Sequence, residues 1–109
     1  MGAGAPCGAR HRSLAGRCGI PREDERVYVA VRLADVAVAP GRRAGRPAAV
    51  RWPDGRTWPV QGVFATQRFG REELGNLCQR WDVEIQGRRV ELWWEHGAWF
   101  VAKGSGLAA

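Results

Sequence analysis

Alternation of apolar and polar side chains is the feature that most constrains this chain. It is clearest over residues 76–86, where Trp81, Val83 and Ile85 share one face and mostly charged or polar residues occupy the other. A period of two indicates a strand with one buried face. The same pattern returns over residues 90–94 after a Gly-Arg turn sequence, so the two runs are predicted to form a hairpin.

Further runs of β-prone residues extend this pattern to most of the chain. Strands are predicted over residues 27–33, 48–52, 57–66 and 76–86, over 90–95, and from Trp99 to Val101. Asp54-Gly55 predicts a tight hairpin turn, and residues 40–47 (PGRRAGRP) have the composition of a loop. Pro59 predicts an edge position or the first turn of its strand. We therefore expect an all-β fold: a small curled sheet or barrel, SH3-like or OB-like, of five to six short antiparallel strands.

The chain divides by composition into three parts. Residues 1–25 are rich in Gly, Ala, Arg and Pro and predict a disordered leader, residues 26–103 form the small β-barrel domain, and residues 104–109 form a flexible tail. The three cysteines do not make a disulfide framework, and their spacing with His11 fits no compact zinc site. No metal or cofactor is predicted, and reduced thiols favour a cytoplasmic protein.

The charge of the chain favours an anionic partner. Seventeen Lys and Arg residues against eleven Asp and Glu give a formal net charge of +6. Small barrels bind nucleic acid with stacking aromatic side chains and a basic groove. The predicted phosphate contacts are Arg42, Arg43, Arg46, Arg51 and Arg56, with Trp52 and Trp58 as stacking groups. Arg68 and Trp99 belong to the wider set of basic and aromatic residues from which such a face is built.

An alternative partner is a protein or a second copy of the chain. Trp81 and Trp94 are in phase with apolar neighbours and are assigned to the core, whereas Trp93 lies between two glutamates. Trp93 is therefore exposed, at an interface, or part of a second small core, and an exposed Trp93 with the edge near Pro59 predicts a protein-binding or dimer surface.

Other classes of function find less support in the sequence. It has no Ser/His/Asp set in a suggestive order, no Gly-rich phosphate loop that opens a helix and no metalloprotease motif, so a non-enzymatic accessory binding module is predicted. No apolar run approaches the ~18 residues of a membrane span, and the first twenty residues hold no apolar segment typical of a secretory signal.

Several of these motifs together resemble a group of small uncharacterised bacterial proteins. The similar segments are W-x-D-G-R-x-W at 52–58, Arg80-Trp81 followed by I-x-G-R at 85–88, and L-W-W-E at 92–95 followed by Trp99-Phe100. The group has arginine-tyrosine where this chain has Arg80-Trp81, and its loop differs at 67–76. Because it has no assigned activity, the resemblance implies a fold over about residues 27–103 and no catalytic residue.

Overall fold

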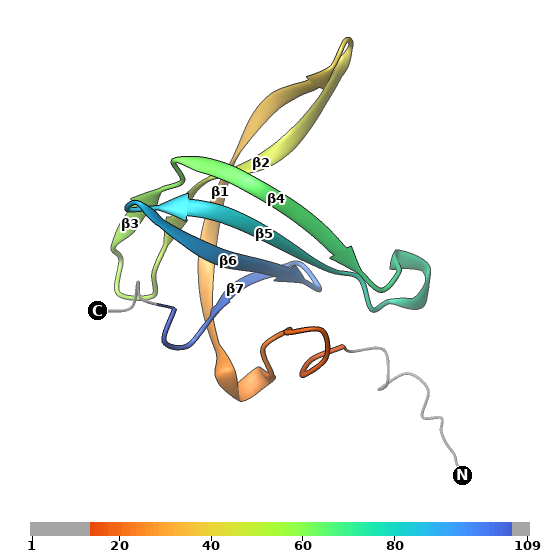
Figure 1. Cartoon of the computed structure of the whole chain (residues 1–109), viewed down its shortest axis with the longest axis vertical. Coiled ribbons are helices and arrows are strands. Elements are labelled where there is room, and N and C mark those ends of the chain that lie inside the picture. The colour runs from red at the N-terminus through yellow and green to blue at the C-terminus, as the bar shows by residue number, and fades with distance from the viewer. Residues whose placement is uncertain (1–13, 106–109) are drawn as a thin grey trace.

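A single curled sheet makes up most of the part of the chain that the structure describes. The computed structural model describes residues 14–105, and within that range seven antiparallel strands pair in the spatial order β3-β2-β1-β7-β6-β5-β4. Figure 1 shows this sheet bending into a half-barrel. The strands are β1 (Arg26–Ala39), β2 (Arg42–Arg51), β3 (Thr57–Pro59), β4 (Gly62–Phe69), β5 (Cys78–Ile85), β6 (Arg88–Glu95) and β7 (Ala98–Ala102); η3 (Glu23–Glu25) and η4 (Glu72–Leu74) are single 3-10 turns.

The predicted all-β class is confirmed, but the number of strands is seven rather than five to six. The predicted strand at 57–66 is divided into β3 and β4 by Val60 and Gln61. Val60 donates its N–H to the carbonyl of Ala48 in β2, and Gln61 donates to the carbonyl of Glu84 in β5. This short crossing therefore connects the two ends of the sheet and draws the half-barrel together on one side.

Strand β1 joins the two halves of the fold. Its first residues, Arg26 to Val29, pair with β7, and the remainder from Ala30 to Ala39 pairs with β2. Where the pairing with β7 ends, β1 and β2 continue together as a two-stranded ribbon that projects from the half-barrel (Figure 1). Residues 40–47 were predicted to be a loop, and this prediction is wrong, because the turn is confined to Pro40 and Gly41 and β2 begins at Arg42.

The last three strands form a meander, as their short connections predict. Ile85 pairs with Arg88, and Glu95 pairs with Ala98, so each hairpin has a two-residue loop. Both residues of each loop have positive φ: 53° and 75° at Gln86-Gly87, and 52° and 77° at His96-Gly97. Such turns match the twist of the strands they connect and need glycine for this backbone conformation. The glycine in each loop therefore fixes the register of β5, β6 and β7.

The inner face of the half-barrel holds the main hydrophobic core. Its fully buried members come from β2, β5, β6 and β7, and half-buried valines and tryptophans pack around them. Trp81, predicted to lie in the core, packs against this cluster while its side chain stays half-buried. The cluster comprises Val50, Trp52, Val83, Ile85, Val90, Leu92 and Val101.

A second, smaller core lies on the outer face of the same strands. It contains Cys78, Trp93 and Phe100, and it is covered by Ile20 from the N-terminal segment. Arg26 ion-pairs with Glu95 at 2.9 Å beside this cluster, and its guanidinium lies 4.0 Å from the centre of the Phe100 ring. Part of the outer face is therefore buried in this second core, while Arg89 and Glu91 farther along β6 remain exposed.

The structure describes the predicted leader, residues 1–25, from residue 14 onward. Residues 1–13 of the predicted leader lie outside the described residues. Among residues 14–25, Ile20 and Pro21 are buried: Ile20 is 2% exposed, and the carbonyl of Pro21 accepts a 3.0 Å hydrogen bond from Nε of Arg26. Ile20, with Leu14 packed beside the same cluster, anchors a segment that is otherwise poor in large apolar side chains.

Candidate functional site

The β1–β2 ribbon keeps one continuous face although its pairing is interrupted. The register shifts between Arg32 and Leu33, where Ala48 of β2 is left unpaired. A bulge of this kind absorbs one extra residue, so side chains before and after it can point the same way. Cross-strand partners share a face, and Arg32 opposite Ala49 therefore lies on the same side as the pair Ala34–Arg46.

This outward face gathers four arginines. Val31 and Val50 are partners on the inner face and contact the core, so the residues on either side of each point outward. We call the outward set the arginine face: Arg32, Arg42, Arg46 and Arg51. From Arg42 to Arg51 the face extends about 30 Å along β2, at ~3.3 Å per residue.

The arginine face makes no ion pairs in the part of the chain that the structure describes. Among residues 14–105, none of its four guanidinium groups makes an ion pair, and the outward positions between them are alanine or valine. Three of the four side chains are exposed and Arg46 is half-buried. Unneutralised charges with small side chains between them leave room for an extended anion to approach several guanidinium groups at once.

A shallow hollow lies between two of these arginines. It has a volume of about 280 Å³, with Arg32 and Arg51 on its walls, Ala30 and Ala49 between them, and Thr57 of β3 beside Arg51. Arg32 was not among the predicted site residues, because it belongs to β1 and joins the others only through the hairpin register. The alternation along β1 places Arg32 on the face opposite to that of Val31, but it does not show that Arg32 lies near Arg51.

Two of the predicted phosphate contacts stand apart from this face. Arg43 points to the opposite side of the ribbon, where its Nε lies 2.9 Å from Oδ2 of Asp35. Arg56 lies in the β2–β3 turn and ion-pairs with Asp54 at 2.7 Å. The backbone N–H of Arg56 also donates to Asp54 and holds the pKa of that carboxyl below its usual value. Both guanidinium groups are therefore partly neutralised.

The two predicted stacking tryptophans are not on the arginine face either. Trp52 is 6% exposed and belongs to the inner core, and Trp58 packs against the same core as the partner of Val50. Both indoles point inward. Trp58 is the cross-strand partner of Val50, which faces the core, and Trp52 lies two positions after Val50, just beyond the end of β2. The burial of Trp52 therefore argues against a stacking role for this residue.

The surface predicted around Trp93 also changes. Trp93 is 1% exposed, so the expectation of an exposed indole is wrong, and the third alternative, membership of a second small core, is the one observed. Ile20 covers it from a distant part of the sequence. The edge position of Pro59 is confirmed, since β3 is the first strand of the sheet. Exposed apolar side chains are found elsewhere, at Val38 and Phe64 among others.

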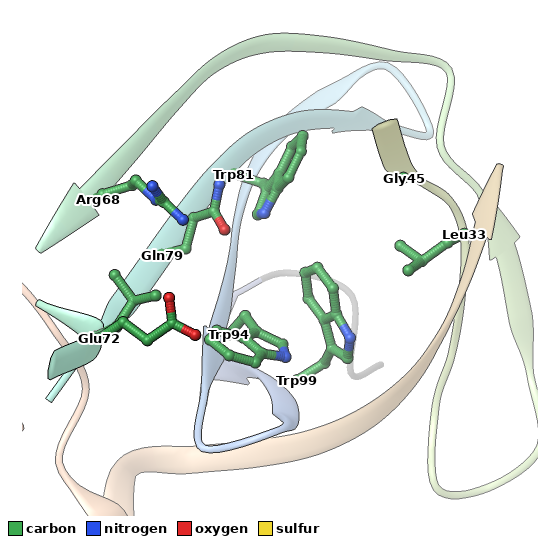
Figure 2. A pocket seen from close by; sticks show the side chains of 9 residues that line it. Leu33, Gly45, Arg68, Glu72, Gln79, Trp81, Trp94 and Trp99 are labelled. Atoms are coloured by element: carbon green, nitrogen blue, oxygen red, sulfur yellow. The ribbon is translucent and has the colours of Figure 1, made fainter. Parts of the chain in front are cut away.

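A second candidate site opens on the concave side of the half-barrel, and Figure 2 shows it. This hollow has a volume of about 290 Å³, and we call it the tryptophan pocket. Three half-buried indoles line it, from Trp81, Trp94 and Trp99 on β5, β6 and β7. Arg68, Glu72 and Gln79 gather at one end, and Leu33 and Gly45 of the ribbon form the other (Figure 2).

The sequence did not indicate this pocket. Trp94 was assigned to the core because it is in phase with Val90 and Leu92, but it lies at the end of β6, where the half-barrel is open. Its direct cross-strand partner is Trp99, and Gln79 lies on its other side. The wider set of basic and aromatic residues is thus partly brought together, since Arg68 and Trp99 line the same pocket.

The described residues offer little support for a metal site or for a reactive thiol. Within residues 14–105, no three His, Cys, Asp or Glu side chains are grouped so that they could hold a metal ion. Cys18 is an exposed free thiol, and Cys78 is a fully buried one. Burial raises the pKa of Cys78 to about 11, and the nearby Glu95 carboxylate adds to this shift. The thiol of Cys78 therefore stays protonated near neutral pH.

Comparison of the chain with protein-family models, with curated protein sequences and with solved structures finds no match. The resemblance to the small bacterial group therefore stays a prediction that rests on the quoted motifs. No helix in the described part of the chain is long and apolar enough to cross a membrane. The two sites described above are accordingly interpreted from their own geometry.

Proposed function

We propose that this protein is a non-enzymatic accessory module that binds nucleic acid with the arginine face of its β1–β2 ribbon. The observation that carries the proposal is the grouping of Arg32, Arg42, Arg46 and Arg51 on one side of the ribbon, with no ion pair to any of them within residues 14–105. Phosphate contacts of this kind supply most of the affinity in sequence-independent binding.

The shape of the ribbon supports the same partner. A two-stranded β-ribbon fits the major groove of duplex DNA, and an extended strand of nucleic acid can also follow its length. The small side chains between the arginines let the phosphate backbone come close to the sheet. Arginine is well suited to phosphate because its planar group donates two parallel hydrogen bonds. The hollow between Arg32 and Arg51 offers one such two-arginine site for a phosphate.

The salt dependence of binding tests this proposal. Each neutralised phosphate adds about −0.9 to the slope of log affinity against log salt for duplex DNA, so four contacts predict a slope of roughly −3.6. Raising salt from about 50 mM to 200 mM should then weaken binding roughly 150-fold. A labelled duplex and a labelled single strand, titrated with the full chain at several salt concentrations, give these slopes directly.

Arg46→Ala and Arg43→Ala form a matched pair of variants on β2. Arg46 lies on the arginine face, and its removal should reduce the slope by about 0.9 for the duplex. Arg43 points to the opposite side and is paired with Asp35, so its removal should leave the slope unchanged. An absence of binding at low salt, or equal effects of the two variants, would count against the arginine face as the binding surface.

A further inference from the structure

The tryptophan pocket has the character of a binding site for a flat ring. Trp81 enters the hollow from one side and Trp94 and Trp99 from the other, so indole surfaces border the same space (Figure 2). Trp94 stands out among them, because it belongs to neither hydrophobic core of the described residues and is still half-buried. Its indole therefore serves the wall of the pocket more than the interior of the protein.

The polar end of the pocket offers a defined set of hydrogen-bonding groups. The side-chain nitrogen of Gln79 donates to Oγ1 of Thr66 at 3.1 Å, and this bond leaves the amide oxygen of Gln79 as an acceptor that faces the hollow (Figure 2). Glu72 supplies a second acceptor and Arg68 a donor. Within residues 14–105 neither Glu72 nor Arg68 makes an ion pair, so both groups are available to a ligand.

The charges at this end select against a simple ion. A bare anion would lie near the carboxylate of Glu72, and a bare cation would lie near the guanidinium of Arg68. A neutral ring with both donors and acceptors on its edge satisfies all three polar groups and stacks on the indoles. A volume of about 290 Å³ is small for a drug-sized ligand and accommodates one ring system.

We propose that the tryptophan pocket binds a single nucleobase that carries an exocyclic amino group, such as adenine or cytosine. The amino group donates to the acceptors of Gln79 and Glu72, and a ring nitrogen or carbonyl accepts from Arg68. Uracil carries no amino group and leaves one acceptor of the pocket unpaired, which lowers its affinity. The pocket lies on the concave side, away from the arginine face, so this inference does not depend on the proposed phosphate contacts.

Titration calorimetry with free nucleosides tests the pocket without any phosphate. Adenosine and cytidine should bind the full chain, and uridine should bind roughly 3- to 10-fold more weakly, as one lost hydrogen bond predicts. Trp94→Ala should weaken adenosine binding roughly 5- to 150-fold, the range of one lost stacking contact. Phe64→Ala, at an aromatic residue 53% exposed elsewhere on the surface, is the matched control and should change nothing.

A second arm identifies the source of the base. Binding of free nucleosides would show that the pocket accepts a free ligand. If free nucleosides do not bind, but a single strand of unpaired adenines binds and Trp94→Ala weakens that binding, the base comes from a nucleic acid. Failure of both nucleosides and unpaired strands to depend on Trp94 would overturn the inference, as would equal affinity for uridine. An Arg46→Ala effect that persists in that case would show that the arginine face acts alone.

Discussion

The buried ion pair between Arg26 and Glu95 gives the sharpest prediction about the stability of this fold. Its two side chains are 4% and 3% exposed and lie 2.9 Å apart. The same arginine donates to the carbonyl of Pro21 and covers the ring of Phe100. Burial lowers the pKa of Arg26, but hydrogen bonds to Tyr28 and Glu95 outweigh this and raise it, so the group stays charged. The pair therefore connects the N-terminal segment, β1 and β6.

Removal of one partner leaves a buried charge without compensation. Arg26→Met is expected to lower the free energy of unfolding by about 3–5 kcal/mol, the cost typical of breaking a buried pair. The pair Arg43–Asp35 has the same 2.9 Å distance, but its side chains are 59% and 68% exposed. Arg43→Ala should therefore cost no more than about 1 kcal/mol, because exposed pairs are screened by solvent. Burial is the main difference between the two ion pairs.

Urea unfolding followed by tryptophan fluorescence measures both variants in the same assay. The double variant Arg26→Met with Glu95→Leu should recover much of the lost stability, since it removes both buried charges together. This recovery distinguishes a charge effect from a simple loss of packing over Phe100. Equal small losses in Arg26→Met and Arg43→Ala, or a double variant as unstable as the sum of its single changes, would refute the reasoning.

Two further predictions concern single residues. The pKa of the Cys78 thiol is raised to about 11 in the folded protein, so the thiol of the unfolded chain, with a pKa of ~8.5, loses its proton first. The free energy of unfolding should therefore fall as the pH rises from ~8.5 to about 11. Cys78→Ala should remove this loss of stability at alkaline pH, as measured by urea unfolding. Gly70→Ala should destabilise more than Gly87→Ala in thermal unfolding, although both glycines have similar φ of 72° and 75°. A Cβ at Gly70 would clash with the carbonyl oxygen of Asn76, whereas one at Gly87 meets nothing within 4 Å. Comparable losses in the two glycine variants would contradict this.

Local patterns predicted the strands whose alternation and turns are both clear. The run at 76–86 contains β5, and the hairpins to β6 and β7 follow from glycine-containing turns. Residues 40–47 were predicted to be a loop because Gly, Pro and Ala are depleted in strands, whereas pairing with β1 keeps most of this segment extended. Had it been recognised as a strand, the period of two would have separated Arg43 from Arg42 and Arg46.

The features that the sequence did not predict depend on contacts between distant parts of the chain. Trp93 lies on the face that its phase indicates, but its burial depends on Ile20, which no local pattern connects to β6. Arg32 joins the arginine face through the bulge at Ala48, and the tryptophan pocket forms where three strands and the ribbon meet. In each case the alternation predicts the face of the strand on which a side chain lies. It does not predict the residues that side chain contacts, because these depend on the strand register and the curvature of the sheet.

The central claim is that nucleic acid contacts the outward face of the β1–β2 ribbon. Amide chemical shifts of isotope-labelled protein, followed during titration with a short oligonucleotide at low salt, test it residue by residue. The account predicts the largest changes at Arg32, Arg46 and Arg51, and little change around Trp93 on the covered outer face. Changes that cluster away from the ribbon, with those three amides unmoved, would contradict it.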